Sequence, residues 1–434
     1  MKHYSLKTMK IPVSSCAALW LCAASSWAFE LDDIMFSGEL SLTAAYSTGF
    51  IFYTKETDEL ELNRIELTYN GIYQFDNGVR VGAQVYAYDH DGISDVQLDW
   101  ANITYQFAPE FGISLGRNKL ANGLFNDAQD LDSTRVFAHL PFGVYNLNFR
   151  PFTSGYNGIG AFGIFDLGAA GSLEYKVGGG WLPNVGRNSH ILSRQLSGGV
   201  TYIDEWDIVG FNYGAWLAWN TPIDGLKIGG SFFRYPDNDL NGRYAFSNEI
   251  TGADLNNAAA VGGLFGARLG LSVPPLVAWD QIFAGNGVRF TDIDLTIHYI
   301  FAQYVRGDLT LNAEFKRRAA PGLRSDDIGF ISGPDDVRRD ESYYIQADYQ
   351  FTDRFAAGIN YSYYDDDYLS DLDRDIVHDY AVAVRYEPIY GLFLKAELHY
   401  INGNRLSSEA RRPESIDVPS ENTVYFVLKS TLSF

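Results

Sequence analysis

The stretch TVYFVLKSTLSF, residues 423–434, alternates between apolar and polar side chains. One face carries Val424, Phe426, Leu428, Leu432 and Phe434, and the other carries Tyr425, Lys429, Thr431 and Ser433. Successive side chains of a strand point to opposite faces, so this segment offers one face to an apolar medium and the other to water. A strand of this kind, ending on an aromatic residue, is typical of the closing strand of a membrane barrel.

Bacterial outer-membrane proteins carry this terminal pattern, with a final Phe, as their assembly signal, and the chain resembles that class here. The resemblance implies that the barrel-assembly machinery recognises Phe434. It also implies an integral protein of a Gram-negative outer membrane, surrounded by outer-membrane lipid and lipopolysaccharide.

The other end of the chain predicts export. Three lysines precede an apolar stretch at residues 11–24, and Ser26-Trp27-Ala28 places small residues where a signal peptidase cleaves. We therefore predict that residues 1–28 are a cleaved Sec signal peptide and that residues 29–434 form one barrel domain. Both cysteines lie in the signal, which leaves a mature chain without thiols in the oxidising periplasm.

Composition favours a barrel over a helical membrane protein. Aromatic residues make up 15% of the chain, yet mean hydropathy is −0.13, as expected for strands with one lipid face and one water face. The longest apolar candidate for a helix, Val261 to Trp279, is interrupted by Arg268 and by Pro274-Pro275. A large soluble all-β protein would share the composition, but not the signal peptide and the terminal strand.

The mature chain is strongly acidic. Losing three lysines with the signal leaves 30 Lys+Arg against 54 Asp+Glu, a formal net charge of −24. Nucleic acid is therefore not an expected partner. The acidic run at Asp371, Asp373 and Asp375 resembles the start of a calcium loop but lacks the glycine, and Val382 stands where the bidentate Glu belongs. We predict no metal site and no cofactor.

Alternating segments set the direction of the chain. A first strand is predicted at Phe36 to Tyr46, and Arg64 to Phe75 turns tightly at residues 76–78 into a third strand. Short turns alternate with long loops, so both termini and the short turns are expected on the periplasmic side. Further strands are predicted at residues 79–88, 96–107, 111–117, 170–178, 199–204, 208–219, 226–235, 290–301, 309–316, 343–351, 355–364, 379–387, 392–401 and 423–434.

A strand pair about every 50 residues favours an all-β transmembrane antiparallel barrel of sixteen strands. Eighteen strands is the alternative, because Val144 to Arg150 and Ile159 to Phe165 fit either two more strands or a long third loop. The apolar stretch 258–279 is assigned to an external loop over or in the mouth, since lipid cannot solvate loop backbone.

The third external loop is too long and too charged for a plain connector. It begins with Gly116-Arg117-Asn118-Lys119 and runs through Gly123-Leu124-Phe125-Asn126-Asp127 to Pro141. Here the chain resembles Gram-negative porins, whose third loop folds into the lumen, and in particular the branch related to the porin O/P group. It departs from that branch in lacking a Pro before Gly123 and in its acidic balance. The resemblance implies a constriction loop near residues 118–143.

A constriction with acids on the loop and cations on the wall creates a transverse field across a pore. We predict that Asp127, Asp130 and Asp132 are the loop acids. The predicted cations are Arg64, Arg80 and Arg117 on inward strand positions, with Lys119 and Arg135 at the base of the loop.

These features predict a porin that passes ions and small hydrophilic solutes by diffusion. The open alternatives are a substrate-selective channel for an anion or small nutrient and a closed structural or adhesive barrel. An enzyme is not expected, because His298 and His399, predicted on inward faces, have no evident serine partner. A homotrimer is implied by the porin resemblance.

Overall fold

The computed structural model describes residues 34–48, 58–90, 93–145, 153–183, 201–246, 287–321, 324–325, 337–366, 376–403 and 422–434. The predicted signal peptide, the acidic run at residues 371–375 and the apolar stretch 258–279 lie outside these ranges. Among the described residues, no helix combines the length and the apolarity needed to cross a bilayer.

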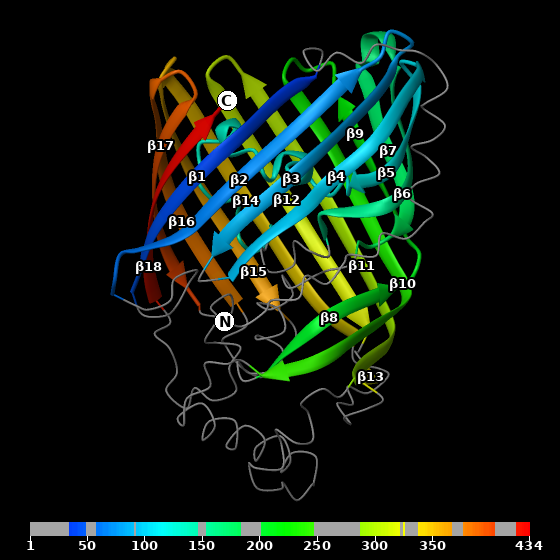
Figure 1. Cartoon of the computed structure of the whole chain (residues 1–434). Coiled ribbons are helices and arrows are strands. Elements are labelled where there is room, and N and C mark those ends of the chain that lie inside the picture. Colours follow the sequence, from blue (N-terminus) through cyan, green and yellow to red (C-terminus); the bar gives the residue numbers. More distant parts are fainter. Residues whose placement is uncertain are drawn as a thin grey trace, which may run out of the picture.

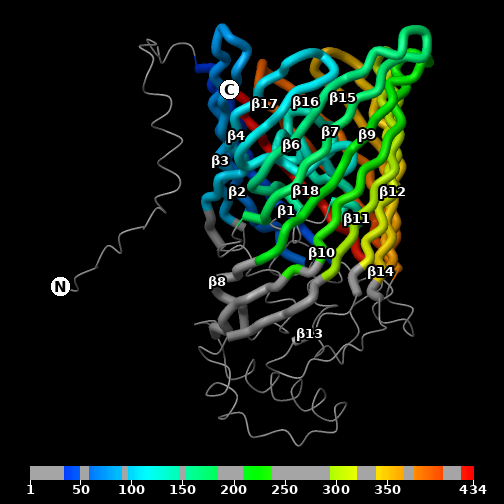
Figure 2. The backbone as a smooth tube through the Cα atoms, turned by 90° about the vertical axis from the view of Figure 1, so that its right-hand side faces the viewer, coloured from blue at the N-terminus to red at the C-terminus, as the bar shows by residue number. Residues whose placement is uncertain are grey.

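Within the described residues, sixteen long antiparallel strands form a closed wall, with β1 paired to β18 (Figures 1 and 2). The order around the wall is β1 (Met35–Ser47), β2 (Glu61–Gln74), β3 (Val79–His90), β4 (Ile93–Ala108), β5 (Phe111–Lys119), β6 (Gly155–Asp166), β7 (Ser172–Trp181), β9 (Asn212–Asn220), β10 (Leu226–Phe246), β11 (Gly287–Arg306), β12 (Leu309–Pro321), β14 (Val337–Thr352), β15 (Phe355–Asp366), β16 (Ile376–Ile389), β17 (Leu392–Asn402) and β18 (Asn422–Ser433).

Two shorter strands extend existing wall strands rather than adding new ones. β8 (Thr201–Val209) pairs with β10 beyond the part of β10 that pairs with β9. β13 (Arg324–Ser325) continues the line of β12 and pairs with β11. The sixteen-strand prediction is therefore confirmed, and the eighteen-strand alternative is not. The strand predicted at residues 199–204 is not one of the sixteen, because its described part belongs to β8.

The two faces of the wall differ as the alternation predicts. In β18, Tyr425, Val427 and Thr431 are fully buried inside the barrel, whereas Leu428 and Leu432 are exposed on the outside. The same division holds in β1 and β2, whose polar residues face inward. An apolar outer face and a polar inner face are what a bilayer and a hydrated lumen require.

Both termini of the barrel lie at the end with the short turns. Gly38 and Phe434 exchange two backbone hydrogen bonds, 2.8 and 3.0 Å long, and Phe434 packs beside Tyr69. The terminal residue therefore completes the seam between the first and last strands. Its predicted role as an assembly signal remains a prediction.

The two segments that fitted either strands or a loop have different structures. Ile159 to Phe165 belongs to wall strand β6, while Val144 and Tyr145 lie in the loop between β5 and β6. Residues 146–150 lie outside the described ranges. A tight turn at residues 221–225 joins β9 to β10.

Candidate pore constriction

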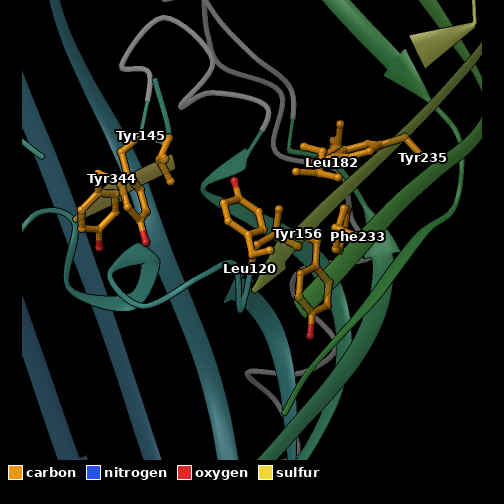
Figure 3. Packing of buried hydrophobic residues seen from close by; sticks show 10 residues of the cluster. Leu120, Tyr145, Tyr156, Leu182, Phe233, Tyr235 and Tyr344 are labelled. Carbon is orange, nitrogen blue, oxygen red and sulfur yellow. The ribbon is translucent and has the colours of Figure 1, made fainter. Parts of the chain in front are cut away.

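The segment from Leu120 to Tyr145 leaves the end of β5 and lies inside the barrel, with two short 3-10 turns at Asn126–Ala128 and Asp132–Thr134. We call this segment the lumenal loop. Its apolar side chains pack against the inner wall in three clusters on different sides. In the largest, Leu120 lies near Tyr156 and Phe233, and Tyr145 lies beside Tyr344 (Figure 3).

Three wall glutamates bind backbone N–H groups of the lumenal loop. Glu39 of β1 accepts from Asp132 N at 2.6 Å and from Ser133 N, Glu314 of β12 accepts from Leu124 N at 3.1 Å, and Glu397 of β17 accepts from His139 N at 3.3 Å. Charged acceptors make stronger hydrogen bonds to N–H groups than neutral ones do. The wall carboxylates therefore accept hydrogen bonds from loop N–H groups that would otherwise need a partner within a strand or helix.

Three wall cations bind the loop's carbonyl oxygens in the same way. Lys316 donates to Val144 O at 3.0 Å, Lys395 to Asp132 O at 2.7 Å and Arg385 to Ser133 O at 3.1 Å. We refer to these cations and the three glutamates together as the six wall anchors. Because these contacts are to backbone, they do not depend on which side chains the loop carries at those positions.

Asp132 is the most heavily paired carboxylate of the lumenal loop. Its oxygens lie 3.1 Å from Lys395, 3.2 Å from Lys429 and 3.2 Å from Arg135, and Thr431 donates to it at 2.6 Å. Burial alone would raise the pKa of the Asp132 carboxyl, but these three cations outweigh burial and hold that pKa well below its usual value. Asp132 is thus a buried ionised anchor.

Asp130 is buried in a second ion-pair group. Lys119 lies 2.7 Å from Asp130 and 3.1 Å from Asp99 of β4, and Gln84 of β3 donates to both carboxylates. Asp130 and Asp132 therefore hold the loop to the wall, and each has a side chain only 3% exposed.

Asp127 differs from the other two loop acids because it is half exposed. It pairs with Lys176, an inward residue of β7, and the two side chains are 48% and 44% exposed. The Lys176 ammonium also lies over the ring of Trp216, 5.4 Å from its centroid. This pair places one accessible charge of each sign between the loop and the wall.

The structure brings Arg64, Asp130 and Arg135 together around one small cavity. The cavity measures about 30 Å³, and Lys429 and Glu66 also line it. A second cavity of about 20 Å³ shares Glu66, Asp130, Arg135 and Lys429 with the first, so the two are adjacent. Both lie between the lumenal loop and the wall.

Two positions predicted to face inward, Arg117 and His298, lie on the outer face, and Arg80 faces inward but lies away from the loop. Arg80 is inward but lies exposed beside the short turn before β3, roughly 13 Å along the strand from Gln84 at about 3.3 Å per residue. Arg117 shares the outer face of β5 with the exposed Leu115, and its Nε donates to Asp99 O at 3.1 Å. His298 is on the outer face of β11 beside Phe232, because the alternation of β11 buries Ile297 and Tyr299 instead.

The second histidine is inward, as predicted. His399 is buried in β17, and its Nδ1 lies 2.9 Å from a carboxylate oxygen of Asp379 in β16. It pairs with acids and aromatic rings of the wall, as expected for a structural group.

Sequence reasoning missed the wall anchors and Lys176. Each is a charged residue on the inner face of a strand, and Lys429 had been placed on the polar face of the final segment without a role. Listing the inward charges of all strands would have named the candidates. Their partners in the loop, however, lie up to 263 residues away in sequence.

No protein-family model and no curated protein matches the chain. Solved structures do match in fold. An anion-selective porin from Comamonas acidovorans is 11% identical, with 92% of this chain and 99% of that one covered and a TM-score of 0.53. OmpF of Salmonella typhi, in complex with daunomycin, is 12% identical, with 94% and 99% covered and a TM-score of 0.53.

The chain has the fold of an outer-membrane porin. A third match, the outer membrane channel DcaP of Acinetobacter baumannii, has a TM-score of 0.51 at 10% identity and covers 93% of this chain and 97% of that one. The predicted porin-type barrel is confirmed as a fold. At such low identity the likeness extends to the fold alone, and the nearer kinship to the porin O/P branch remains a prediction.

Proposed function

We propose that the protein is a passive channel for ions and small hydrophilic solutes, narrowed by the lumenal loop. The observation that carries the proposal is a closed barrel with a polar inner face and a loop fixed across its lumen. Selection would follow from size and from the charges near Asp127 and Lys176.

We also propose self-association as a trimer, with β2 and β4 in the contact. Toward the long-loop end of the outer face, these strands expose Leu62 at 67% and Val96 at 70%. The corresponding part of β10 to β14 carries the ion pairs Arg234–Asp294 and Arg317–Glu341 instead. At this level of the barrel, exposed apolar residues on β2 and β4, in place of ion pairs, support contact with a second copy.

The test is single-channel recording of the refolded mature protein in planar bilayers. Ohmic steps are expected, closing in three equal levels if the active unit is a trimer. Steps of a single level would support the channel proposal and contradict the trimer proposal.

A barrel whose lumen is blocked, so that it does not conduct, is the second candidate. The loop is anchored to strands on several sides of the wall, and the two cavities beside it have the size of a few water molecules. Folded protein that inserts in the bilayer but never conducts would overturn the channel proposal and support this one.

The exposed charge pair predicts the direction of ion selectivity in two variants. Lys176→Gln leaves Asp127 uncompensated, so we expect a reversal-potential shift toward cations under a salt gradient. Asp127→Asn leaves Lys176 uncompensated and is expected to shift it toward anions. Arg80→Gln, a change at the short-turn end, is the control. Shifts of the same sign in both variants would show that this pair does not face the solute path.

A further inference from the structure

A charged side chain lies within the apolar outer face of the barrel. Arg117 is on the outer face of β5, where it pairs in register with Ala101 of β4. Toward the short-turn end its outward neighbours are Leu115 and Ile103, and toward the long-loop end the next outward residue of β4 is Leu98. All three of these apolar side chains are exposed. Arg117 therefore lies within the kind of surface that faces lipid elsewhere on the wall.

A guanidinium group is a poor neighbour for lipid. It keeps its charge at every pH that a protein meets and carries five N–H donors, whereas hydrocarbon has no acceptor. Arginine on the lipid face of a transmembrane barrel is destabilising, most of all near the middle of the bilayer. The Nε–H group of Arg117 donates to Asp99 O at 3.1 Å, which holds the side chain against β4. Contacts between proteins, by contrast, are enriched in arginine.

The outer face beside Arg117 carries small side chains. From Ala101 the row in register continues through Ala83 of β3 to Gly71 of β2, and these strands lie side by side in the wall (Figure 1). The rows on either side carry larger exposed side chains, Val81 and Ile103 on one and Val85 and Leu98 on the other. Because small residues let another chain approach closely, a second protein can pack along this row up to Arg117.

The same strands form the trimer contact proposed above. Leu62 of β2 and Val96 of β4 lie on this outer face, farther toward the long-loop end. Arg117 is on β5, the strand next to β4, so it continues that contact toward the middle of the barrel. A group that is unfavourable in lipid thus lies where a second copy is expected.

We propose that Arg117 binds a second copy of this chain by donating hydrogen bonds from its guanidinium group to an oxygen on the outer face of the neighbouring barrel. This contact rests on the trimer proposed above and adds one residue on which the trimer depends. The second copy packs along the row of small residues and separates Arg117 from lipid. Hydrogen bonds from a charged donor are stronger than neutral ones, so loss of this donor weakens the contact.

The first test replaces Arg117 with leucine and measures the mass of the refolded mature protein in mild detergent by light scattering. Leucine suits a lipid-facing position better than arginine, so a residue that faces lipid would leave the trimer unchanged. A residue that binds a second copy would leave its acceptor without a donor, and we expect Arg117→Leu to lose the trimer. The matched control is Arg234→Leu, because Arg234 is also on the outer face but pairs at 2.7 Å with Asp294 of the neighbouring strand. We expect the control to remain trimeric.

The possible results separate the two proposals. A trimer in Arg117→Leu that matches the parental protein would overturn the role of Arg117 and leave the trimer proposal standing. A parental protein that is monomeric would overturn both.

The second test keeps Arg117 and therefore decides the outcome if Arg117→Leu does not fold. A photo-crosslinking amino acid replaces Leu98, the exposed residue of β4 next to Arg117 on the long-loop side. Irradiation of the protein in lipid vesicles is expected to join two copies covalently. The same amino acid in place of Ile300, which is exposed on the outer face of β11, should join none. Crosslinks from Leu98 to lipid alone would show that lipid covers this part of the wall and would overturn the proposal, as would equal yields of joined copies from both positions.

Discussion

Replacing Gly123 with alanine is expected to release the start of the lumenal loop and to raise the single-channel conductance several-fold. Gly123 has φ +62°, a left-handed conformation that costs an L-residue about 1–2 kcal/mol. A Cβ at this position would overlap Oε1 of Glu314. The carboxylate would have to leave the position in which it accepts hydrogen bonds from Leu124 N, Tyr145 and Tyr344.

The matched control for this variant is Gly168→Ala. Gly168 lies between β6 and β7 with φ +61°, and a Cβ added there would meet no atom within 4 Å, so this change adds the backbone strain without the clash. We expect the control to keep the parental conductance. Equal conductance in both variants would show that the loop does not limit the current.

Replacing Asp132 with asparagine is expected to produce the largest loss of stability. The change removes the carboxylate that pairs with Lys395, Lys429 and Arg135, and the Lys395 side chain is fully buried. Leaving a buried charge uncompensated costs roughly 3–5 kcal/mol. Urea unfolding of the barrel in lipid, followed by tryptophan fluorescence, measures the change in midpoint.

Asp127→Asn is the matched control, because its ion pair with Lys176 is about half exposed and such pairs contribute about 0–1 kcal/mol. A midpoint for Asp132→Asn that equals the control would contradict the anchoring role of Asp132.

The Asp132 carboxylate also determines how the stability of the docked loop changes at acid pH. A carboxyl group whose pKa is lowered by folding stabilises the folded state above its unfolded pKa, near 3.8, and loses that contribution as pH falls through the folded value. The Asp132 contribution should therefore be constant from about pH 5 to about pH 6, which urea midpoints measured across that range would check.

The strands at both ends of the barrel were predictable because their inner and outer faces differ in polarity. The alternation failed at β6, where Gly158 and Gly160 occupy inward positions and the hydroxyl of Tyr156 lies against Gly160. Glycine carries no polarity signal, so the pattern could not separate this strand from the loop before it.

The lumenal loop was predictable, but the roles of its acids were not. Asp127, Asp130 and Asp132 look alike in the sequence, and the fold alone separates the exposed one from the two buried ones. Asp132 differs from Asp127 because it pairs with Lys395 and Lys429. These two lysines lie beside the loop only once the barrel has closed. No local pattern contains that information.

The six wall anchors bind the lumenal loop through its peptide groups, which every amino acid shares. At these six contacts the barrel interior therefore recognises the course of the loop backbone, whereas Gly123 and Asp132 are required as particular residues. Exposed residues such as Asp127 and Thr134 can be replaced, or made to carry a reporter group, while the wall anchors keep the lumenal loop in place. With the proposed channel function, this property would suit the barrel to nanopore sensing, in which the exposed loop residues are exchanged and the wall anchors are left unchanged.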